Sequence, residues 1–328
     1  MAVGRRLAVL LGTLLGLPLM TAGTPLHAQA PAAIASRDQL AGGLLRLEYA
    51  MRDRPPGAAA VADLNRAFDR ASLAFFAGRF ADALATLDSL AAVVEPDSAV
   101  RGSQRAAAAR AFAATAAQTR TLTAAPGAAI PYRVYAPANR APGVRLPLVV
   151  ALHGAGGDEN MFLEAYGAGA IRALADARGF IVATPLTTAL LRAPDALARL
   201  IDTLAAELPV DRARVYLLGH SLGAAAAWNL ARLRPDLVAA VVCIAGACGG
   251  VSAPAPPRVP PLLAVVGELD PLATPARVES AATDARTAGR TVEFRRIPGY
   301  GHTLVVGAVL PDVVDWLLRQ PPIGPPPD

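Results

Sequence analysis

Residues 216–223 read Tyr-Leu-Leu-Gly-His-Ser-Leu-Gly, a sequence that predicts a sharp turn between a strand and a helix. The apolar run before the first glycine predicts a strand, and the Ala-rich run over Leu222–Arg234 predicts a helix. Because Gly219 and Gly223 lack side chains, the backbones of strand and helix can come together at a sharp turn. We therefore expect Ser221 to stand exposed at the tip of this turn as a nucleophile; a structural Gly-Ser turn is the alternative.

Short apolar runs alternate with helical stretches on both sides of this turn. The predicted strands are Ile130–Ala136, Leu148–Leu152, Phe180–Ala183, Val215–Leu218, Leu237–Ala245, Leu262–Val266 and Val292–Ile297. The predicted helices are Met161–Arg178, Asp195–Glu207, Leu222–Arg234, Pro275–Ala288 and Thr303–Arg319. This alternation indicates an α/β domain over residues 119–320, with a parallel sheet covered by helices on both faces. A Pro-rich tail follows at residues 321–328.

A nucleophilic serine needs a base, and His302 is the candidate. The chain has four histidines. His27 lies in the N-terminal leader, and His153 lies in a glycine-rich loop before the nucleophile. His220 is a poor base because it adjoins Ser221 in the turn, where neighbouring side chains point in different directions. His302 follows the last predicted strand in a Gly-Tyr-Gly-His loop; a surface histidine is the alternative.

The acid that orients the base should follow a strand and fall between nucleophile and base in chain order. Asp270, which follows the strand Leu262–Val266, meets both conditions. Glu268 is the rival because it is closer to the strand end, whereas Asp284 falls within a predicted helix and should face solvent. Asp270 would hold the imidazole of His302 in the tautomer that accepts the serine proton.

A glycine-rich loop with the sequence His-Gly-Ala-Gly-Gly begins at His153, directly after the predicted strand Leu148–Leu152. Its glycines, among them Gly154 and Gly156, allow backbone N–H groups to turn toward a substrate oxygen. We expect the N–H groups of Ala155 and Leu222 to bind the developing oxyanion, and His153 to hydrogen-bond within the loop. A phosphate-binding loop is excluded, because no Gly-Lys-Ser/Thr follows and the chain contains no Lys.

These segments resemble the α/β-hydrolase superfamily, through LVVALHGAGGDEN at Leu148–Asn160 and through GHSLG, GELD and GYGH. In detail they are similar to its secreted esterase branch, the polyhydroxybutyrate-depolymerase and feruloyl-esterase-like group, which overlaps phospholipase/carboxylesterases and prolyl-oligopeptidase-type catalytic domains. The likeness covers about Thr119–Arg319. It implies an α/β-hydrolase fold with an eight-stranded, mostly parallel sheet covered by helices on both faces. It also implies hydrolysis of a small-molecule or polymeric ester through an acyl-enzyme on Ser221, with Asp270 and His302 completing the triad and with no cofactor or metal.

Residues 31–118 are predicted to be helical, with roughly four helices separated by Pro- and Gly-containing breaks. Leu73–Asp97 resembles one tetratricopeptide helix pair, but no second copy follows. A single pair cannot form a solenoid, so we expect it to bury its apolar face on the rest of the chain. Protein contact through these helices is a further option. The superfamily's core fold does not include this segment, and these residues contain no Trp- or Ser/Thr-rich stretch of the kind that polymer-binding appendages have.

Residues 1–30 have the layout of a secretory signal peptide. Arg5 and Arg6 precede an apolar run of 14 residues, Leu7–Met20, and Ala28-Gln29-Ala30 resembles a cleavage site. The run is shorter than the ~20 residues of a spanning helix, so export to the periplasm or medium without a membrane span is expected; an uncleaved anchor is the alternative.

The net charge of +5 and the 5% aromatic content, with arginines scattered among acids, argue against nucleic-acid binding.

Cys243 and Cys248 leave two states open. Export permits a disulfide, whereas an extended strand end would keep the Cα atoms too far apart for one.

The Pro-rich connection 246–261 has no room for a helical cap, so an open cleft for short-chain or bulky polymeric esters is expected unless the N-terminal helices cover the site. Two other functions remain: a prolyl-oligopeptidase-type peptidase, although no β-propeller precedes the domain, and a binding protein that uses the helical hairpin.

Overall fold

The computed structural model describes residues 31–115, 117–125, 128–139, 141–249 and 259–324. The chain divides into two compact units, residues 1–35 and 36–328, and the second contains both the sheet and the helical region from residue 36 on. The predicted signal peptide with His27, residues 250–258 of the Pro-rich connection and residues 325–328 of the tail lie outside the described residues.

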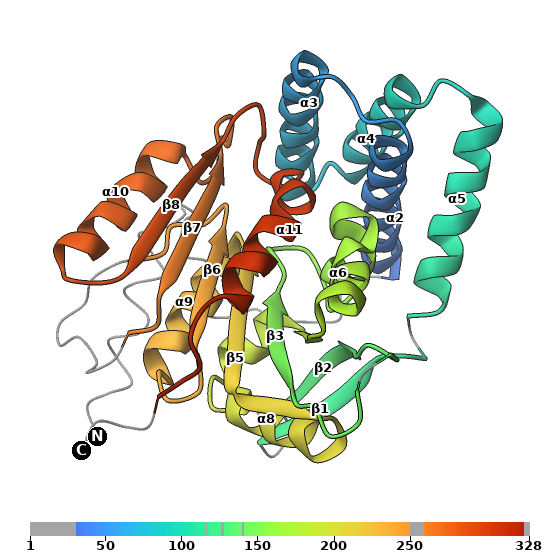
Figure 1. Ribbon diagram of the computed structural model, residues 1–328. Helices are drawn as coiled ribbons and strands as arrows, with labels where there is room; N and C mark the ends of the chain where they lie inside the picture. Colours follow the sequence, from blue (N-terminus) through green and yellow to red (C-terminus); the bar gives the residue numbers. More distant parts are fainter. Residues whose placement is uncertain (1–30, 116, 126–127, 140, 250–258, 325–328) are drawn as a thin grey trace, which may run out of the picture. The chain divides into compact units, whose positions relative to one another are not determined.

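One eight-stranded sheet forms the centre of the second unit, in the order β1-β2-β4-β3-β5-β6-β7-β8 (Figure 1). The strands are β1 (Arg120–Ala125), β2 (Ala128–Tyr135), β3 (Leu146–Leu152), β4 (Ile181–Pro185), β5 (Val210–His220), β6 (Ala240–Ile244), β7 (Leu262–Gly267) and β8 (Val292–Ile297). β2 pairs antiparallel with β1 and with β4, and every other pair is parallel. The predicted mostly parallel sheet is confirmed, and β1 is a strand that the sequence did not predict.

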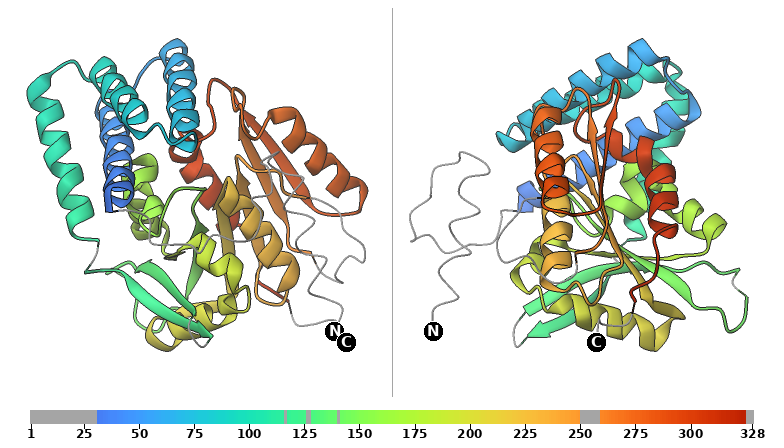
Figure 2. Two further views of the ribbon diagram at one scale, coloured as in Figure 1. Left: turned by 180° about the vertical axis from the view of Figure 1, so that it is seen from behind. Right: turned by 60° about the vertical axis from the view of Figure 1, so that its left-hand side comes forward.

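Helices cover both faces of the sheet. They are α6 (Ala170–Arg178), α7 (Thr187–Arg192), α8 (Ala196–Glu207), α9 (Leu222–Leu233), α10 (Pro275–Thr287) and α11 (Val305–Leu318). Because side chains alternate along a strand, Val149 packs in the core with α6 and α11 while Val150 packs with α8 and α9. In the right-hand view of Figure 2, α10 (orange) and α11 (red) lie on opposite sides of the strands. The fully buried strands explain the near-continuous apolar runs in the sequence.

The prediction of one continuous helix over Met161–Arg178 is wrong. A π-helical turn η1 (Met161–Ala165) is followed by a 3-10 turn η2 (Tyr166–Gly169), and only then does α6 begin. Gly167 and Ala168 have positive φ values of 58° and 55°, which a continuous right-handed helix does not allow. A Cβ atom on Gly167 would lie 3.0 Å from the Cα of Gly307 in α11, so the glycine permits this close approach.

Cys243 and Cys248 form a disulfide with a Cα–Cα distance of 6.4 Å, which resolves the alternative that the sequence left open. β6 ends at Ile244, and the next residue, Ala245, has a φ of 52°. The chain therefore leaves the extended conformation between the two cysteines, and their Cα atoms come within the range that a disulfide requires.

The N-terminal helices are α2 (Pro31–Asp53), α3 (Ala58–Phe76), α4 (Phe80–Val94) and α5 (Ser98–Ala113), separated at the predicted breaks. Figure 1 shows α2, α3 and α4 gathered at one end of the strands. Leu47, Phe68 and Leu87 from these helices join the core cluster that contains Phe162 of η1. The helical region therefore shares one hydrophobic core with the sheet domain.

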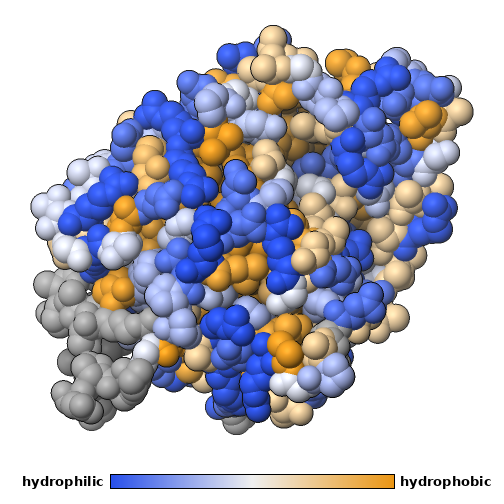
Figure 3. Space-filling model, viewed as in Figure 1, coloured by the Kyte–Doolittle hydropathy of each residue, from blue (hydrophilic) through white to orange (hydrophobic). Residues whose placement is uncertain are grey.

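On the face in Figure 3, hydrophilic and hydrophobic residues are interspersed. The large exposed apolar side chains of the described residues are scattered through the chain: Leu73, Phe76, Val93, Val100, Val144, Leu233 and Leu272. No helix within the described part of the chain is long and apolar enough to cross a bilayer.

Candidate active site

Ser221 occupies the sharp turn between β5 and α9, with φ 54° and ψ −115°. A Cβ atom on Gly219 would lie 2.1 Å from the carbonyl oxygen of Gly223, and one on Gly223 would lie 1.9 Å from that of Leu152. No side chain fits at either glycine position, so the two glycines permit the turn. The Ser221 N–H donates to the Ile244 carbonyl at 2.9 Å, which ties the strained residue to the neighbouring strand.

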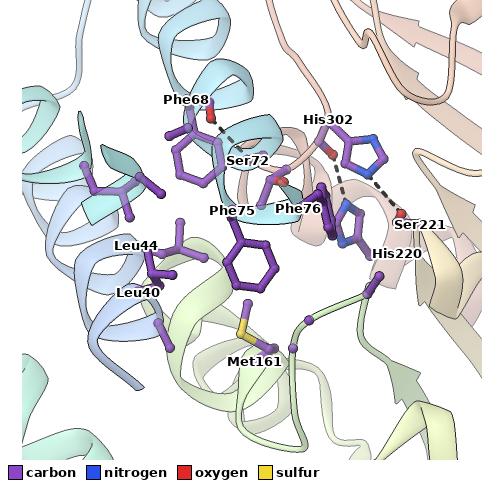
Figure 4. Close-up of a pocket in the computed structure, with 18 of the residues that line it drawn as sticks. Leu40, Leu44, Phe68, Ser72, Phe75, Phe76, Met161, His220, Ser221 and His302 are labelled. Atoms are coloured by element: carbon purple, nitrogen blue, oxygen red, sulfur yellow. Dashed lines mark hydrogen bonds between the residues drawn. The ribbon is translucent and has the colours of Figure 1, made fainter. Parts of the chain in front are cut away.

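The structure brings Ser221, His302 and Asp270 together at the carboxyl ends of β5, β8 and β7. Nε2 of His302 lies 2.9 Å from Oγ of Ser221 (Figure 4). Nδ1 of His302 lies 2.9 and 3.0 Å from the two carboxylate oxygens of Asp270. A hydrogen on Nδ1 that is donated to Asp270 leaves the lone pair of Nε2 directed at the serine hydroxyl. This is the arrangement in which imidazole can accept the serine proton.

Asp270 is fixed by its own surroundings. Its Oδ1 atom accepts the backbone N–H groups of Leu272 and Ala273, both at 2.8 Å, and only 3% of the residue is exposed. The rival acid Glu268 instead accepts the N–H of Gly299 at the surface. Asp284 is exposed on α10, as expected. Of the three acidic candidates, only Asp270 orients the imidazole.

His220 and His153 are buried supports of the loops around Ser221. His220 donates from Nε2 to the carbonyl of His302 at 3.0 Å and accepts the Tyr166 hydroxyl at Nδ1 at 2.9 Å. Burial holds the pKa of His220 well below its usual value, so the neutral ring can make both bonds. His153 accepts the N–H of Thr187 at Nε2 and donates from Nδ1 within its own loop; burial lowers its pKa as well.

The two expected oxyanion donors belong to the residue after the serine and to the glycine-rich loop. Leu222 is the first residue of α9, so its N–H has no acceptor within the helix and lies at the positive end of the helix dipole. Ala155 is exposed in the turn closed by the bond from Gly157 N–H to the Gly154 carbonyl, at 3.2 Å. A Cβ atom on Gly154 would lie 2.8 Å from Nδ1 of His220, so glycine lets the loop pass close to the elbow.

Two polar residues of α3 hold the loop that carries His302, and the sequence reasoning missed both. Oδ1 of Asn65 accepts the N–H of Gly301 at 2.8 Å. Both carboxylate oxygens of Asp69 accept the N–H of His302, at 3.1 and 3.2 Å. A Cβ atom on Gly301 would lie 2.0 Å from the Asp69 carboxylate. Burial raises the pKa of Asp69 to about 6. A polar pair four residues apart on the apolar face of α3, beside Phe68, is the signal that could have revealed them.

A cavity of about 120 Å³ opens beside Ser221, between the glycine-rich loop and the N-terminal helices (Figure 4). The open cleft expected from the short Pro-rich connection is therefore replaced by the alternative, in which the N-terminal helices cover the site. The helices contribute Leu40, Ala41, Leu44, Phe68, Ala71, Ser72, Phe75, Phe76, Ala83 and Leu87 to its walls. Within the described residues, no cluster of three or more His, Cys, Asp or Glu side chains could hold a metal ion.

Residues 147–262 match the sequence model of the alpha/beta hydrolase fold family. Over these residues the chain is similar to the α/β-hydrolase superfamily. Over 160 residues it is 32% identical to NocK of Nocardia uniformis subsp. tsuyamanensis, which is provisionally named an esterase. That alignment covers 44% of this chain and 46% of NocK, so the chain spans about half the length of the curated relative it matches.

Solved α/β-hydrolases share the fold at low sequence identity. A thermostable esterase superposes with a TM-score of 0.51 at 22% identity, covering 62% of each chain. The S-formylglutathione hydrolase FrmB of Staphylococcus aureus has a TM-score of 0.51 at 16% identity, over 61% of this chain and 96% of its own. A feruloyl esterase module of Clostridium thermocellum, complexed with sinapinate, has a TM-score of 0.52 at 15% identity, over 62% of this chain and 87% of its own.

The family match includes some residues of the candidate active site but not all of them. It includes the glycine-rich loop at residues 153–157 and Ser221. Asp270 and His302 lie beyond residue 262, and Asn65 and Asp69 lie before residue 147. The assignment of these four residues therefore rests on the hydrogen bonds of this structure.

Proposed function

We propose that this chain is an exported serine hydrolase that cleaves carboxylic esters through an acyl-enzyme intermediate. One observation carries the proposal: the hydrogen-bonded series from Asp270 through His302 to Ser221, at 2.9–3.0 Å, at the tip of a nucleophile elbow. The likeness to a protein named as an esterase favours esters over other acyl compounds. Export rests on the signal-peptide layout of residues 1–30.

The first half of the reaction forms the acyl-enzyme. Nε2 of His302 takes the hydroxyl proton as Oγ of Ser221 attacks the ester carbonyl carbon. The carbonyl oxygen becomes an oxyanion, which the N–H groups of Ala155 and Leu222 would stabilise. When the tetrahedral intermediate collapses, the bond from carbon to the alcohol oxygen breaks, and His302 returns its proton to the departing alcohol.

The second half repeats these steps with water. His302 takes a proton from a water molecule as the water oxygen attacks the acyl carbon. It then returns a proton to Oγ of Ser221 as the carboxylic acid leaves. In both halves an imidazolium forms beside the buried carboxylate of Asp270, which stabilises the positive charge. Loss of one oxyanion donor in such a site typically costs about 3 kcal/mol of transition-state stabilisation.

The proposal is tested with the purified protein and its Ser221→Ala variant. Hydrolysis of p-nitrophenyl acetate and butyrate should be readily measured for the parent and fall to the background rate for Ser221→Ala. A fluorophosphonate probe should label the parent once, at Ser221. The control is Ser89→Ala, which removes an exposed serine of α4 and should change neither result. Equal rates for parent and Ser221→Ala would refute the proposal, and faster cleavage of peptide anilides than of esters would favour a peptidase.

A further inference from the structure

The N-terminal helices build a large part of the cavity beside Ser221. Phe75 of α3 reaches the glycine-rich loop, where a Cβ atom on Gly156 would lie 2.4 Å from its ring. Figure 4 shows Leu40 and Leu44 of α2 on the far side of the Phe75 ring from the Ser221–His302 pair. The walls of the cavity therefore depend on a segment outside the sheet domain.

The lining of this cavity is mostly apolar, and among the described residues it carries no Asp, Glu or Arg. Its polar side chains are those of Ser72, Tyr166, His220, Ser221, His302 and Thr303. The Tyr166 hydroxyl is already engaged with His220, and the Ser72 hydroxyl donates to the Phe68 carbonyl at 3.3 Å. A charged group placed here would lose its hydration without gaining a partner, so the cavity selects against it.

The size of the cavity limits what can enter. An engineered apolar cavity of about 150 Å³ binds benzene. A volume of about 120 Å³ therefore accommodates a chain of roughly four to six carbons or a single small ring. A longer chain would extend beyond the part of the cavity that Phe75 and the leucines of α2 and α4 enclose.

From these walls we infer that the N-terminal helices form the specificity pocket of the enzyme, and that one side of the scissile ester is an uncharged apolar group of about four to six carbons. The inference rests on the proposed ester hydrolysis at Ser221. Phe75 is its chief specificity-determining residue because the ring extends from α3 to the loop at Gly156, beside the nucleophile. The group can be the acyl chain or the alcohol, and the assay distinguishes the two.

The test measures kcat/KM for two series of esters. One varies the acyl chain of p-nitrophenyl esters from two to twelve carbons, and the other varies the alcohol of acetate esters, followed by proton release. The kcat/KM of the parent should be highest at four to six carbons in one series only, and that series identifies the side of the ester that enters the pocket. Phe75→Ala should raise the ratio of kcat/KM for the eight-carbon to the four-carbon substrate by about 10-fold or more in that series.

A second variant changes the pocket in the opposite direction. Ala41 of α2 is half-buried and lines the cavity, so Ala41→Leu should shorten the preferred chain and lower the same ratio by about 10-fold. The control is Leu73→Ala, whose side chain lies on α3 but outside the lining and is 43% exposed; its chain-length profile should equal that of the parent. Ala41→Leu carries the test if Phe75→Ala does not fold.

The outcomes separate this inference from the proposed function. If the parent cleaves short esters and Ser221→Ala does not, but neither pocket variant changes the chain-length profile, the specificity pocket is refuted and the esterase stands. A parent that prefers ten- to twelve-carbon or charged groups in both series refutes it as well. If the parent cleaves no ester faster than Ser221→Ala, the proposed function fails and the inference fails with it.

Discussion

Removal of the Asp69 carboxylate tests whether α3 sets the position of His302. The N–H of His302 has both oxygens of Asp69 as acceptors, at 3.1 and 3.2 Å, and it is buried with the residue only 4% exposed. In Asp69→Ala this donor loses its partner in a place that water does not readily reach. The loop must either bear that cost, about 1–3 kcal/mol, or shift until the N–H finds another acceptor.

A shift of the loop moves the imidazole relative to Ser221. Nε2 lies 2.9 Å from Oγ, and a displacement of about 1 Å in such a site can cost roughly 100-fold in rate. We expect kcat of Asp69→Ala on p-nitrophenyl butyrate to fall about 10- to 100-fold. KM should stay close to the parent value, because Asp69 is not among the residues that line the cavity.

Two further variants make this result interpretable. Asp69→Asn keeps an acceptor oxygen for the His302 N–H and should recover most of kcat. Asp82→Ala removes an exposed carboxylate from α4 and should leave kcat unchanged. If Asp69→Ala folds and its kcat equals that of the parent, or if KM alone changes, the hydrogen bond from α3 does not position the base.

Three other predictions concern stability and use urea unfolding as the measurement. Burial raises the pKa of Glu48 from 4.5 to about 8, so the folded protein retains a proton that the unfolded chain releases. The free energy of unfolding should therefore fall as the pH rises from about 4.5 to 8, by at most about 5 kcal/mol. Glu48→Gln should flatten this decline. Glu164→Ala leaves the guanidinium of Arg133 buried and should cost about 3–5 kcal/mol, because both side chains of this ion pair are only 4% exposed. Replacement of both Cys243 and Cys248 by alanine should cost about 2 kcal/mol, since a loop this short restricts the unfolded chain only modestly.

Each stability prediction has a matched comparison. Glu279→Gln changes an exposed carboxylate of α10 and should leave the pH dependence as it is in the parent. Asp202→Ala breaks an exposed ion pair and should cost less than about 1 kcal/mol. The disulfide prediction is contradicted if the double alanine variant and the parent unfold at the same urea concentration.

The parts of the site that follow strands were predictable from the sequence, because their signals are local. The turn at Ser221 needs glycines two residues away on each side, and the chain has them there. The scarcity of histidine then left His302 as the only base, and strand order favoured Asp270. Each of these inferences uses residues within a few positions of a strand end, where parallel strands bring their loops to one edge of the sheet.

The contacts that cross the chain were not predictable in this way. Asp69 and His302 are 233 residues apart, and no spacing rule relates two positions so distant. The break at Gly167 depends on the close approach of α11, and the disulfide depends on the unusual φ of Ala245. These features follow from packing between elements, which hydrophobic periodicity does not encode.

The bond between Asn65 and Gly301 joins positions 236 residues apart, so the two residues are synthesised at different times. At about 5–20 residues per second, a ribosome needs roughly 10–50 s to proceed from one to the other. During that interval Ser221 is synthesised, but the histidine that activates it and the loop that α3 holds do not yet exist. A growing chain with this arrangement cannot cleave esters, so the proposed activity begins only after the first and last segments of the second unit have met.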